Sequence, residues 1–315
     1  MLQVEHLTKR YGAVTAVDDL SFEIEREGVY GFLGPNGAGK STTMNIMTGC
    51  LSATAGTVRI SGYDIYESPR EAKRRVGYLP EQPPLYLGET PEEYLRFVGE
   101  AKGLRGAELR RQIEAVVEET GIGDMRRRRI SALSKGYRQR VGIAQALLGE
   151  PDTVILDEPT VGLDPLQILE IRALIASLGE SRTVLISSHI LSEVQAMCSK
   201  ILIISHGRLV AFDAPDALEA RLASPGEISV TAETDAVAAQ ALVAGISGVS
   251  GVEVVSDSPG RSRLTVTAGT GDVYELSKEI FLAFAGNNTA LCELGVRKAS
   301  LEDIFLELTE GGEAQ

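Results

Sequence analysis

Cysteine, histidine and tryptophan are scarce in this chain. Its 315 residues include three cysteines, three histidines and no tryptophan. Cys50, Cys198 and Cys292 are far apart and form no Cys-x-x-Cys pair. Disulfides and a zinc site are therefore not expected, and a reducing compartment fits. We interpret each cysteine as a small buried apolar residue.

Long apolar runs and basic stretches are also missing. No apolar run reaches the roughly 18 residues of a membrane span, and Met1–His6 is not a basic region followed by an apolar one. We expect no signal peptide and no direct membrane insertion. The net charge is −13, and residues 227–315 carry 14 acidic against 5 basic residues. An acidic chain without a basic stripe is not expected to bind nucleic acid, and the charge is most simply a means of solubility.

Short strands alternate with helices over roughly the first two thirds of the chain, which predicts an α/β domain with a mainly parallel sheet. The strands are predicted at residues 2–6, 20–25, 29–33, 57–62, 75–79, 153–157, 182–187 and 200–204. The helices are predicted at residues 40–47, over most of 91–129, and at 134–148, 165–178 and 190–198.

A second pattern follows a segment that contains two prolines, Ala211–Gly226, which we interpret as a connector. The order strand, helix, strand, strand, helix, strand beyond it is typical of a small α+β ferredoxin-like domain. A last helix is predicted at about residues 300–308. We therefore predict a first domain at 1–220, with a helical subdomain at about 85–150, and an accessory domain at 227–315.

A phosphate-binding loop is predicted between the strand at 29–33 and the helix that starts at Lys40. The sequence matches G-x-x-x-x-G-K-[ST] in this context. Its glycines let backbone N–H groups surround phosphate oxygens. Lys40 can reach the β- and γ-phosphates, Ser41 can offer a hydroxyl to Mg²⁺, and Thr42 can reach the α-phosphate. The loop consists of Gly34, Pro35, Asn36, Gly37, Ala38, Gly39, Lys40 and Ser41.

Two acids, Asp157 and Glu158, end the buried strand that begins at about residue 153. Ligands bind at this end of the strands in open α/β sheets. Asp157 fits the residue that holds Mg²⁺, and Glu158 fits the base that orients the attacking water. Ser134 lies about 20 residues earlier. Taken alone, it is most simply the N-cap of the following helix.

These motifs in this order resemble the ABC (ATP-binding cassette) ATPases over residues 1 to about 220. Ser134-Lys135-Gly136-Tyr137 resembles the family's signature segment, usually LSGGQ, from which Lys135 and Tyr137 depart. The resemblance implies that Ser134 and Gly136 contact ATP, that Asp164 belongs to a D-loop, and that His189 senses the γ-phosphate. It also implies that Tyr11 stacks on adenine, although such a tyrosine is otherwise a half-buried packing residue.

One position departs from the family. After Gly77-Tyr78-Leu79-Pro80, where the family usually carries a glutamine that contacts Mg²⁺ and couples to the membrane partner, this chain has Glu81 followed by Gln82. Either residue can serve in that position. A carboxylate would add negative charge near the metal.

The resemblance implies an ATP- and Mg²⁺-dependent transport ATPase on the cytoplasmic face of the inner (plasma) membrane. Two cassettes, identical or different, would enclose ATP and drive a separate integral membrane permease. Finer likeness, as in Ser300-Leu301-Glu302-Asp303-Ile304-Phe305, is to subunits that serve ABC-2-type permeases, a group of gliding-motility, drug-resistance and copper-processing exporters. Residues 227–300 match nothing recognisable, and a packing or dimer-stabilising appendage or a regulatory domain would fit.

Two other classes of protein fit the sequence less well. A soluble ABC ATPase acting on ribosomes or nucleic acid would usually carry two cassettes or a long coiled coil between these motifs. Here a single P-loop and signature are separated by about 90 residues. The other alternative, a catalytically inactive scaffold, disagrees with the presence of Lys40, Asp157, Glu158 and His189.

Overall fold

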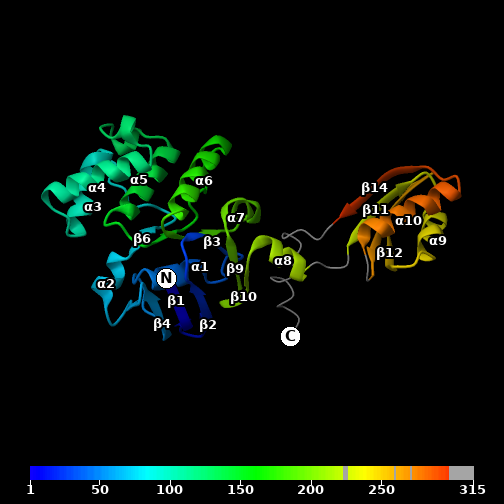
Figure 1. Ribbon diagram of the computed structural model, residues 1–315, viewed down its shortest axis with the longest axis horizontal. Coiled ribbons are helices and arrows are strands. Elements are labelled where there is room, and N and C mark those ends of the chain that lie inside the picture. Colours follow the sequence, from blue (N-terminus) through cyan, green and yellow to red (C-terminus); the bar gives the residue numbers. More distant parts are fainter. Residues whose placement is uncertain (223–225, 259, 270–271, 298–315) are drawn as a thin grey trace. The chain divides into compact units, whose positions relative to one another are not determined.

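The computed structural model describes residues 1–222, 226–258, 260–269 and 272–297 (Figure 1). The chain divides into two compact units, of which the first spans Met1–Pro215 and the second begins at Asp216. Among the described helices, none is long and apolar enough to cross a membrane. The helix predicted at about 300–308 lies outside the described residues.

An antiparallel sheet forms the N-terminal part of the first unit. Its strand order is β2-β1-β4-β5. Buried apolar residues such as Leu2, Val4 and Leu7 of β1 face the core. β1 and β2 are longer than predicted. Irregularities in their pairing, such as β-bulges, interrupt the apolar alternation on which a prediction from sequence depends. The strands are β1 (Leu2–Tyr11), β2 (Val14–Ile24), β4 (Ala55–Ile60) and β5 (Tyr63–Asp64).

A second sheet, mainly parallel as predicted, carries the site. Its strand order is β10-β9-β3-β8-β7-β6, and pairing is parallel from β9 to β6. β7 and β8 are buried along their whole length, which explains their continuous apolar runs. The strands are β3 (Gly28–Leu33), β6 (Val76–Leu79), β7 (Thr153–Leu156), β8 (Thr183–Ser188), β9 (Lys200–Ser205) and β10 (Arg208–Asp213).

The prediction of a connector at 211–226 was wrong in its first part. Residues 208–213 form β10, which pairs antiparallel with β9 at the edge of the sheet. Its side chains are only partly buried, so its apolar pattern is weak. Pro215 begins helix α8 (Pro215–Leu222), because proline fits the first turn of a helix, where an N–H would have no partner.

Helices α5, α6 and α7 pack against strands of the second sheet (Figure 1). Helices α3, α4 and α5 pack against one another. α3 begins with a capping box, in which the Thr90 hydroxyl accepts from the Glu93 N–H and the Glu93 carboxylate accepts from the Thr90 N–H at 2.9 Å. The helices of this unit are α1 (Lys40–Met47), α2 (Pro69–Arg74), α3 (Pro91–Ala101), α4 (Gly106–Glu119), α5 (Lys135–Leu147), α6 (Pro165–Gly179) and α7 (Leu191–Met197).

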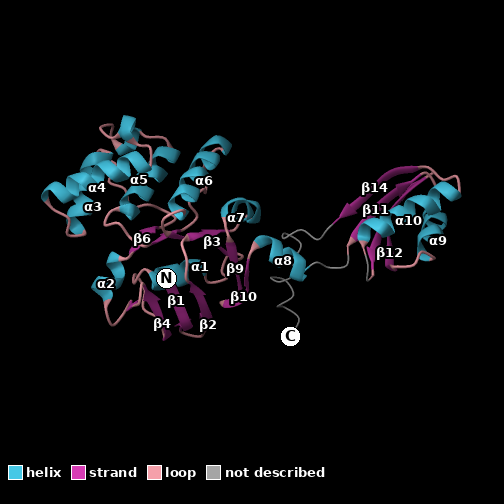
Figure 2. Cartoon of the chain, in the orientation of Figure 1, coloured by secondary structure: helices cyan, strands magenta, loops and turns pink. Residues whose placement is uncertain are grey.

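The second unit contains the predicted order of strands and helices within its described residues. Its antiparallel sheet has the order β12-β13-β11-β14, which is the ferredoxin-like arrangement. Helices α9 and α10 pack against the sheet (Figure 2), and Ile228, Ile280 and Phe284 lie in the core between them. The elements are β11 (Glu227–Ala232), α9 (Ala236–Ala244), β12 (Val249–Ser258), β13 (Arg261–Ala268), α10 (Val273–Gly286) and β14 (Leu291–Arg297).

The three cysteines do not share one environment, which corrects the prediction that all are buried. Cys198 is buried, whereas Cys50 and Cys292 are exposed. Burial raises the pKa of the Cys198 thiol to about 12, and thiolates rather than thiols react with alkylating agents.

We expect iodoacetamide at pH 8 to alkylate Cys50 and Cys292 of the native protein first, and Cys198 on the order of 100-fold more slowly. Peptide mass spectrometry of a time course measures this. In urea all three cysteines should react at similar rates. Equal rates in the native protein would contradict the burial of Cys198.

Candidate active site

The loop between β3 and α1 has the backbone geometry of a phosphate-binding loop. Gly37 and Gly39 adopt positive φ angles of 83° and 101°, which side-chain-bearing residues rarely adopt. A Cβ atom at Gly39 would lie only 2.4 Å from the carbonyl oxygen of Ala16. The loop turns at these glycines and presents the first N–H groups of α1 at its open side.

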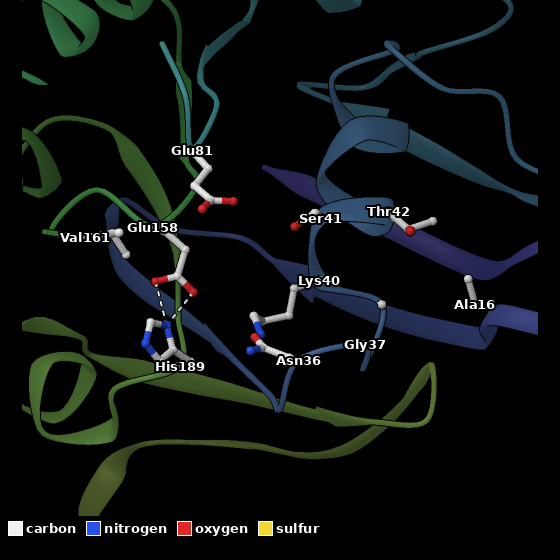
Figure 3. Close-up of a pocket in the computed structure, with 11 residues that line it drawn as sticks. Ala16, Asn36, Gly37, Lys40, Ser41, Thr42, Glu81, Glu158, Val161 and His189 are labelled. Carbon is white, nitrogen blue, oxygen red and sulfur yellow. Dashed lines mark hydrogen bonds and ion pairs between the residues drawn. The ribbon is translucent and has the colours of Figure 1, made fainter.

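A cavity of about 480 Å³ lies over this loop. Figure 3 shows Lys40, Ser41 and Thr42 on one side of it and Glu81, Glu158 and His189 facing them. Such a volume is typical of small-molecule sites. Ala16 and Val161, which sequence reasoning did not identify, also line it. The predicted residues that line it are Asn36, Gly37, Gly39, Lys40, Ser41, Thr42, Glu81, Glu158 and His189.

The Lys40 side chain is buried and turned onto its own loop. Its Nζ donates to the carbonyl oxygens of Gly34 at 2.6 Å and Pro35 at 3.1 Å. Burial lowers the pKa of Lys40, while the nearby carboxylates of Glu158 and Asp157 oppose that shift. Lys40 is one of the residues that line the cavity, and its ammonium favours an anionic ligand there.

The two acids after β7, Asp157 and Glu158, are both hydrogen-bonded to one serine, Ser187. The Ser187 hydroxyl donates to Asp157 Oδ1 at 2.5 Å and accepts from the Glu158 backbone N–H at 2.9 Å. Asp157 and Ser187 are buried, and Glu158 has a φ of 49°, in the left-handed region that is rare for residues other than glycine. Ser187 thus orients the Asp157 carboxylate and anchors the backbone at Glu158. Sequence reasoning missed it, and its only signal is its place at the end of the neighbouring strand.

Glu158 and His189 are in direct contact. His189 Nδ1 lies 3.0 Å from both carboxylate oxygens of Glu158 (Figure 3). The Glu158 side chain is 11% exposed and that of His189 is 48% exposed. A carboxylate held by an imidazole at the edge of a cavity has the geometry of an acid–base pair.

The structure distinguishes Glu81 from Gln82. Glu81 lines the cavity over the phosphate-binding loop (Figure 3). Gln82 lines only an adjoining cavity of about 530 Å³, which Glu81 also lines and which includes Lys135 and Arg138 of the α5 region. The alternatives left open by the sequence are therefore placed differently, and the carboxylate is the one that faces the loop.

Several predicted residues lie outside the lining of the cavity. Tyr11 is 49% exposed, and Lys9 Nζ lies 5.1 Å from the centroid of its ring. The Ser134 side chain caps α5 by accepting from the Tyr137 N–H at 3.3 Å. The Asp164 side chain caps α6 by accepting from the Gln167 N–H at 2.9 Å. The others that are not among the lining residues are Gly34, Pro35, Ala38, Gln82, Gly136 and Asp157.

The signature segment and the start of α6 lie close together within the chain. A Cβ atom at Gly136 would come within 2.9 Å of the Gln167 side chain. The exposed N-terminus of α5 therefore lies beside the loop that contains Asp164. A helix N-terminus favours an anion, yet neither Ser134 nor Gly136 lines the cavity that holds Lys40.

Fold and site together define a P-loop nucleotide-binding protein with a carboxylate–imidazole pair, Glu158 and His189, next to its phosphate loop. A protein-family model described as "ABC transporter" matches residues 17–161. The chain is 31% identical to the linearmycin resistance ATP-binding protein LnrL of Bacillus subtilis, over 98% of both chains. It is 34% identical to the bacitracin transport ATP-binding protein BcrA of Bacillus licheniformis, over 99% of this chain and 98% of the relative.

Among solved structures, the chain resembles the dimeric structure of MJ0796, a bacterial ABC transporter cassette. The TM-score is 0.61 with 25% identity, and the match covers 68% of this chain and 98% of the cassette. The chain therefore belongs to the ABC transporter ATP-binding proteins. It is the ATP-binding subunit of an ABC transporter and an ATPase.

Proposed function

We propose that two cassettes, at least one of them this chain, close around ATP and drive export through a separate ABC-2-type permease. The observation that carries the proposal is the split between two groups of residues. The residues expected to act on phosphate line one cavity, whereas Ser134 and Gly136 of the signature segment lie outside it. A second cassette would supply the missing half.

In this proposal the phosphate loop holds the triphosphate. Backbone N–H groups between Gly34 and Thr42 surround its oxygens, with Pro35, Asn36 and Ala38 fixing the turn. Lys40 leaves the carbonyl oxygens of its own loop and pairs with the β- and γ-phosphates. Tyr11, exposed and 5.1 Å from the Lys9 ammonium, stacks on adenine.

A magnesium ion would be held by Ser41 and Asp157. The ion prefers hard oxygen ligands and keeps several waters, and a hydroxyl and a carboxylate are ligands of this kind. Ser41 lines the cavity, and Asp157 is oriented by Ser187. When bound, the ion neutralises charge on the β- and γ-phosphates. Glu81 adds a further carboxylate across the cavity from Ser41, in the place of the family's usual glutamine.

Hydrolysis would use Glu158 as the base. Its carboxylate orients a water molecule and accepts a proton as the water oxygen attacks the γ-phosphorus, so that the bond to the β-phosphate oxygen breaks and ADP and phosphate form. Lys40 stabilises charge on the transferring group. His189 keeps the Glu158 carboxylate aimed and senses the γ-phosphate.

The second half of each site would come from the facing cassette. Its α5 N-terminus, with Ser134 and Gly136, would contact the γ-phosphate, and its Asp164 loop would lie at the interface. The dimeric MJ0796 cassette supports this arrangement. Loss of the γ-phosphate would remove the charge that joins the two subunits, and the dimer would open. Identical subunits and a sister cassette both fit this geometry.

The proposed partner is an integral membrane permease of the ABC-2 type, contacted through the Glu81 loop and the helical segment 85–129. LnrL and BcrA are named for linearmycin resistance and bacitracin transport, which supports a drug-export role. The chain would then lie on the cytoplasmic face of the plasma membrane. Their match over nearly the whole chain disfavours a ribosomal or nucleic-acid role.

To test this, we would capture the tagged Glu158→Gln variant with ATP and Mg²⁺ from detergent-solubilised membranes of its native cell. We expect a polytopic membrane protein at stoichiometric yield. The same purification with Lys40→Ala, which should fail to hold the triphosphate, is the matched control for the nucleotide state. Recovery of ribosomes or soluble partners without a membrane protein would contradict the transporter role.

A further inference from the structure

Glu193 is a buried acid that no step above uses. It lies in α7, which begins two residues after His189, and it is only 4% exposed. A buried carboxylate is costly unless it is hydrogen-bonded and paired. Its contacts therefore indicate what it holds in place.

Its strongest contact is with the loop that follows Glu158. The hydroxyl of Thr160, itself 4% exposed, donates to Glu193 Oε2 at 2.5 Å. A hydrogen bond to a charged acceptor is roughly twice as strong as a neutral one. The bond joins the residue two positions after Glu158 to the helix that follows His189, and these segments are otherwise 33 positions apart in sequence.

The second contact is a longer ion pair with α6. Arg172 Nη2 lies 3.9 Å from Glu193 Oε1, too far for a hydrogen bond. α7 itself is closely seated on β3, since a Cβ atom at Gly31 would lie 2.1 Å from Val194 Cγ1. α7 is thus held firmly against the sheet, and the Glu193 side chain connects the helix to the loop after Glu158.

We infer that Glu193 is a positioning residue. Through Thr160, it holds the Glu158 loop where the Glu158 carboxylate contacts His189. Neither Glu193 nor Thr160 lines the nucleotide cavity, so they act through the contact between Glu158 and His189, which is 3.0 Å long. The inference rests on the roles proposed for Glu158 and His189. A displacement of about 1 Å at a reacting group can reduce turnover about 100-fold.

A pair of variants at Thr160 tests the bond without changing the residues of the cavity. Thr160→Val keeps the shape and removes the hydroxyl, whereas Thr160→Ser keeps the hydroxyl. We expect Thr160→Val to lower kcat by about 10- to 100-fold with little change in KM for ATP, and Thr160→Ser to restore most of it. Glu193→Ala should match Thr160→Val, and thermal unfolding checks that each variant is folded.

If Thr160 only stabilised the fold, its replacement would not change the surroundings of the His189 ring. The NMR signals of that ring therefore distinguish a positioning role from a purely structural one. The chain has three histidines, His6, His189 and His206, and their ¹⁵N-labelled rings can be resolved by NMR and assigned by substitution. We expect Thr160→Val to move the His189 signals toward those of Glu158→Ala, where the contact is absent. The His6 signals, set by Asp19 at 2.8 Å, should stay in place.

Unchanged His189 signals in Thr160→Val, or a wild-type kcat in that variant, would overturn the inference. Such a result leaves the proposed function intact if Glu158→Gln is inactive. A wild-type kcat in Glu158→Gln would instead contradict the proposed function itself, whatever the His189 signals show.

Discussion

Glu158→Gln is expected to hydrolyse ATP about 10²- to 10⁴-fold more slowly than the wild-type protein, which is the usual contribution of a general base. The amide is isosteric and keeps an acceptor for His189, but it cannot take a proton from water. The residues that hold the triphosphate are unchanged, so the affinity for ATP should stay within a few-fold. Steady-state phosphate release and equilibrium ATP binding measure the two effects separately.

Glu180→Gln is a matched control, because it makes the same change at an exposed site at the C-terminal end of α6. It should leave phosphate release unaffected. A Glu158→Gln protein that retains wild-type turnover would show that another group activates the water, and loss of ATP binding would point to a misfolded cavity.

The phosphate loop and the sheet that carries it were predictable from sequence for a physical reason. A buried parallel strand is a continuous apolar run, and the glycines at 37 and 39 are required by backbone angles that other residues avoid. α1 begins at Lys40 and ends at Met47, as predicted. This part of the site depends on residues that are neighbours in the sequence, so it can be predicted from the sequence.

The parts that could not be predicted depend on contacts between distant segments. Ser187 joins Asp157 to the Glu158 backbone only because β7 and β8 are neighbours in the sheet. Residues 208–213 form the strand β10 because they pair with β9 at the edge of the sheet. The choice between Glu81 and Gln82 depends on which side chain the loop turns toward the cavity. None of these has a periodicity or spacing that a single sequence reveals.

Ser134→Ala should weaken the ATP-bound dimer on the order of 100-fold or more. In the proposed dimer each Ser134 hydroxyl donates to a γ-phosphate of the facing subunit, and a hydrogen bond to a charged group contributes about 1.5–3 kcal/mol. A symmetric dimer loses two such bonds. Sedimentation in the Glu158→Gln background, with ATP and Mg²⁺, measures the dimer constant, while ATP binding by the monomer should persist because the phosphate loop is intact.

The Ser134→Ala change also removes a helix cap, so the effect of lost stability must be separated from that of the lost contact. Thr90 is the matched control, since its side chain caps α3 as Ser134 caps α5. Each alanine variant should lose about 1 kcal/mol of stability. If Thr90→Ala dimerises normally and Ser134→Ala does not, the hydroxyl acts across the interface. Equal weakening in both variants would mean that Ser134 is a cap and nothing more.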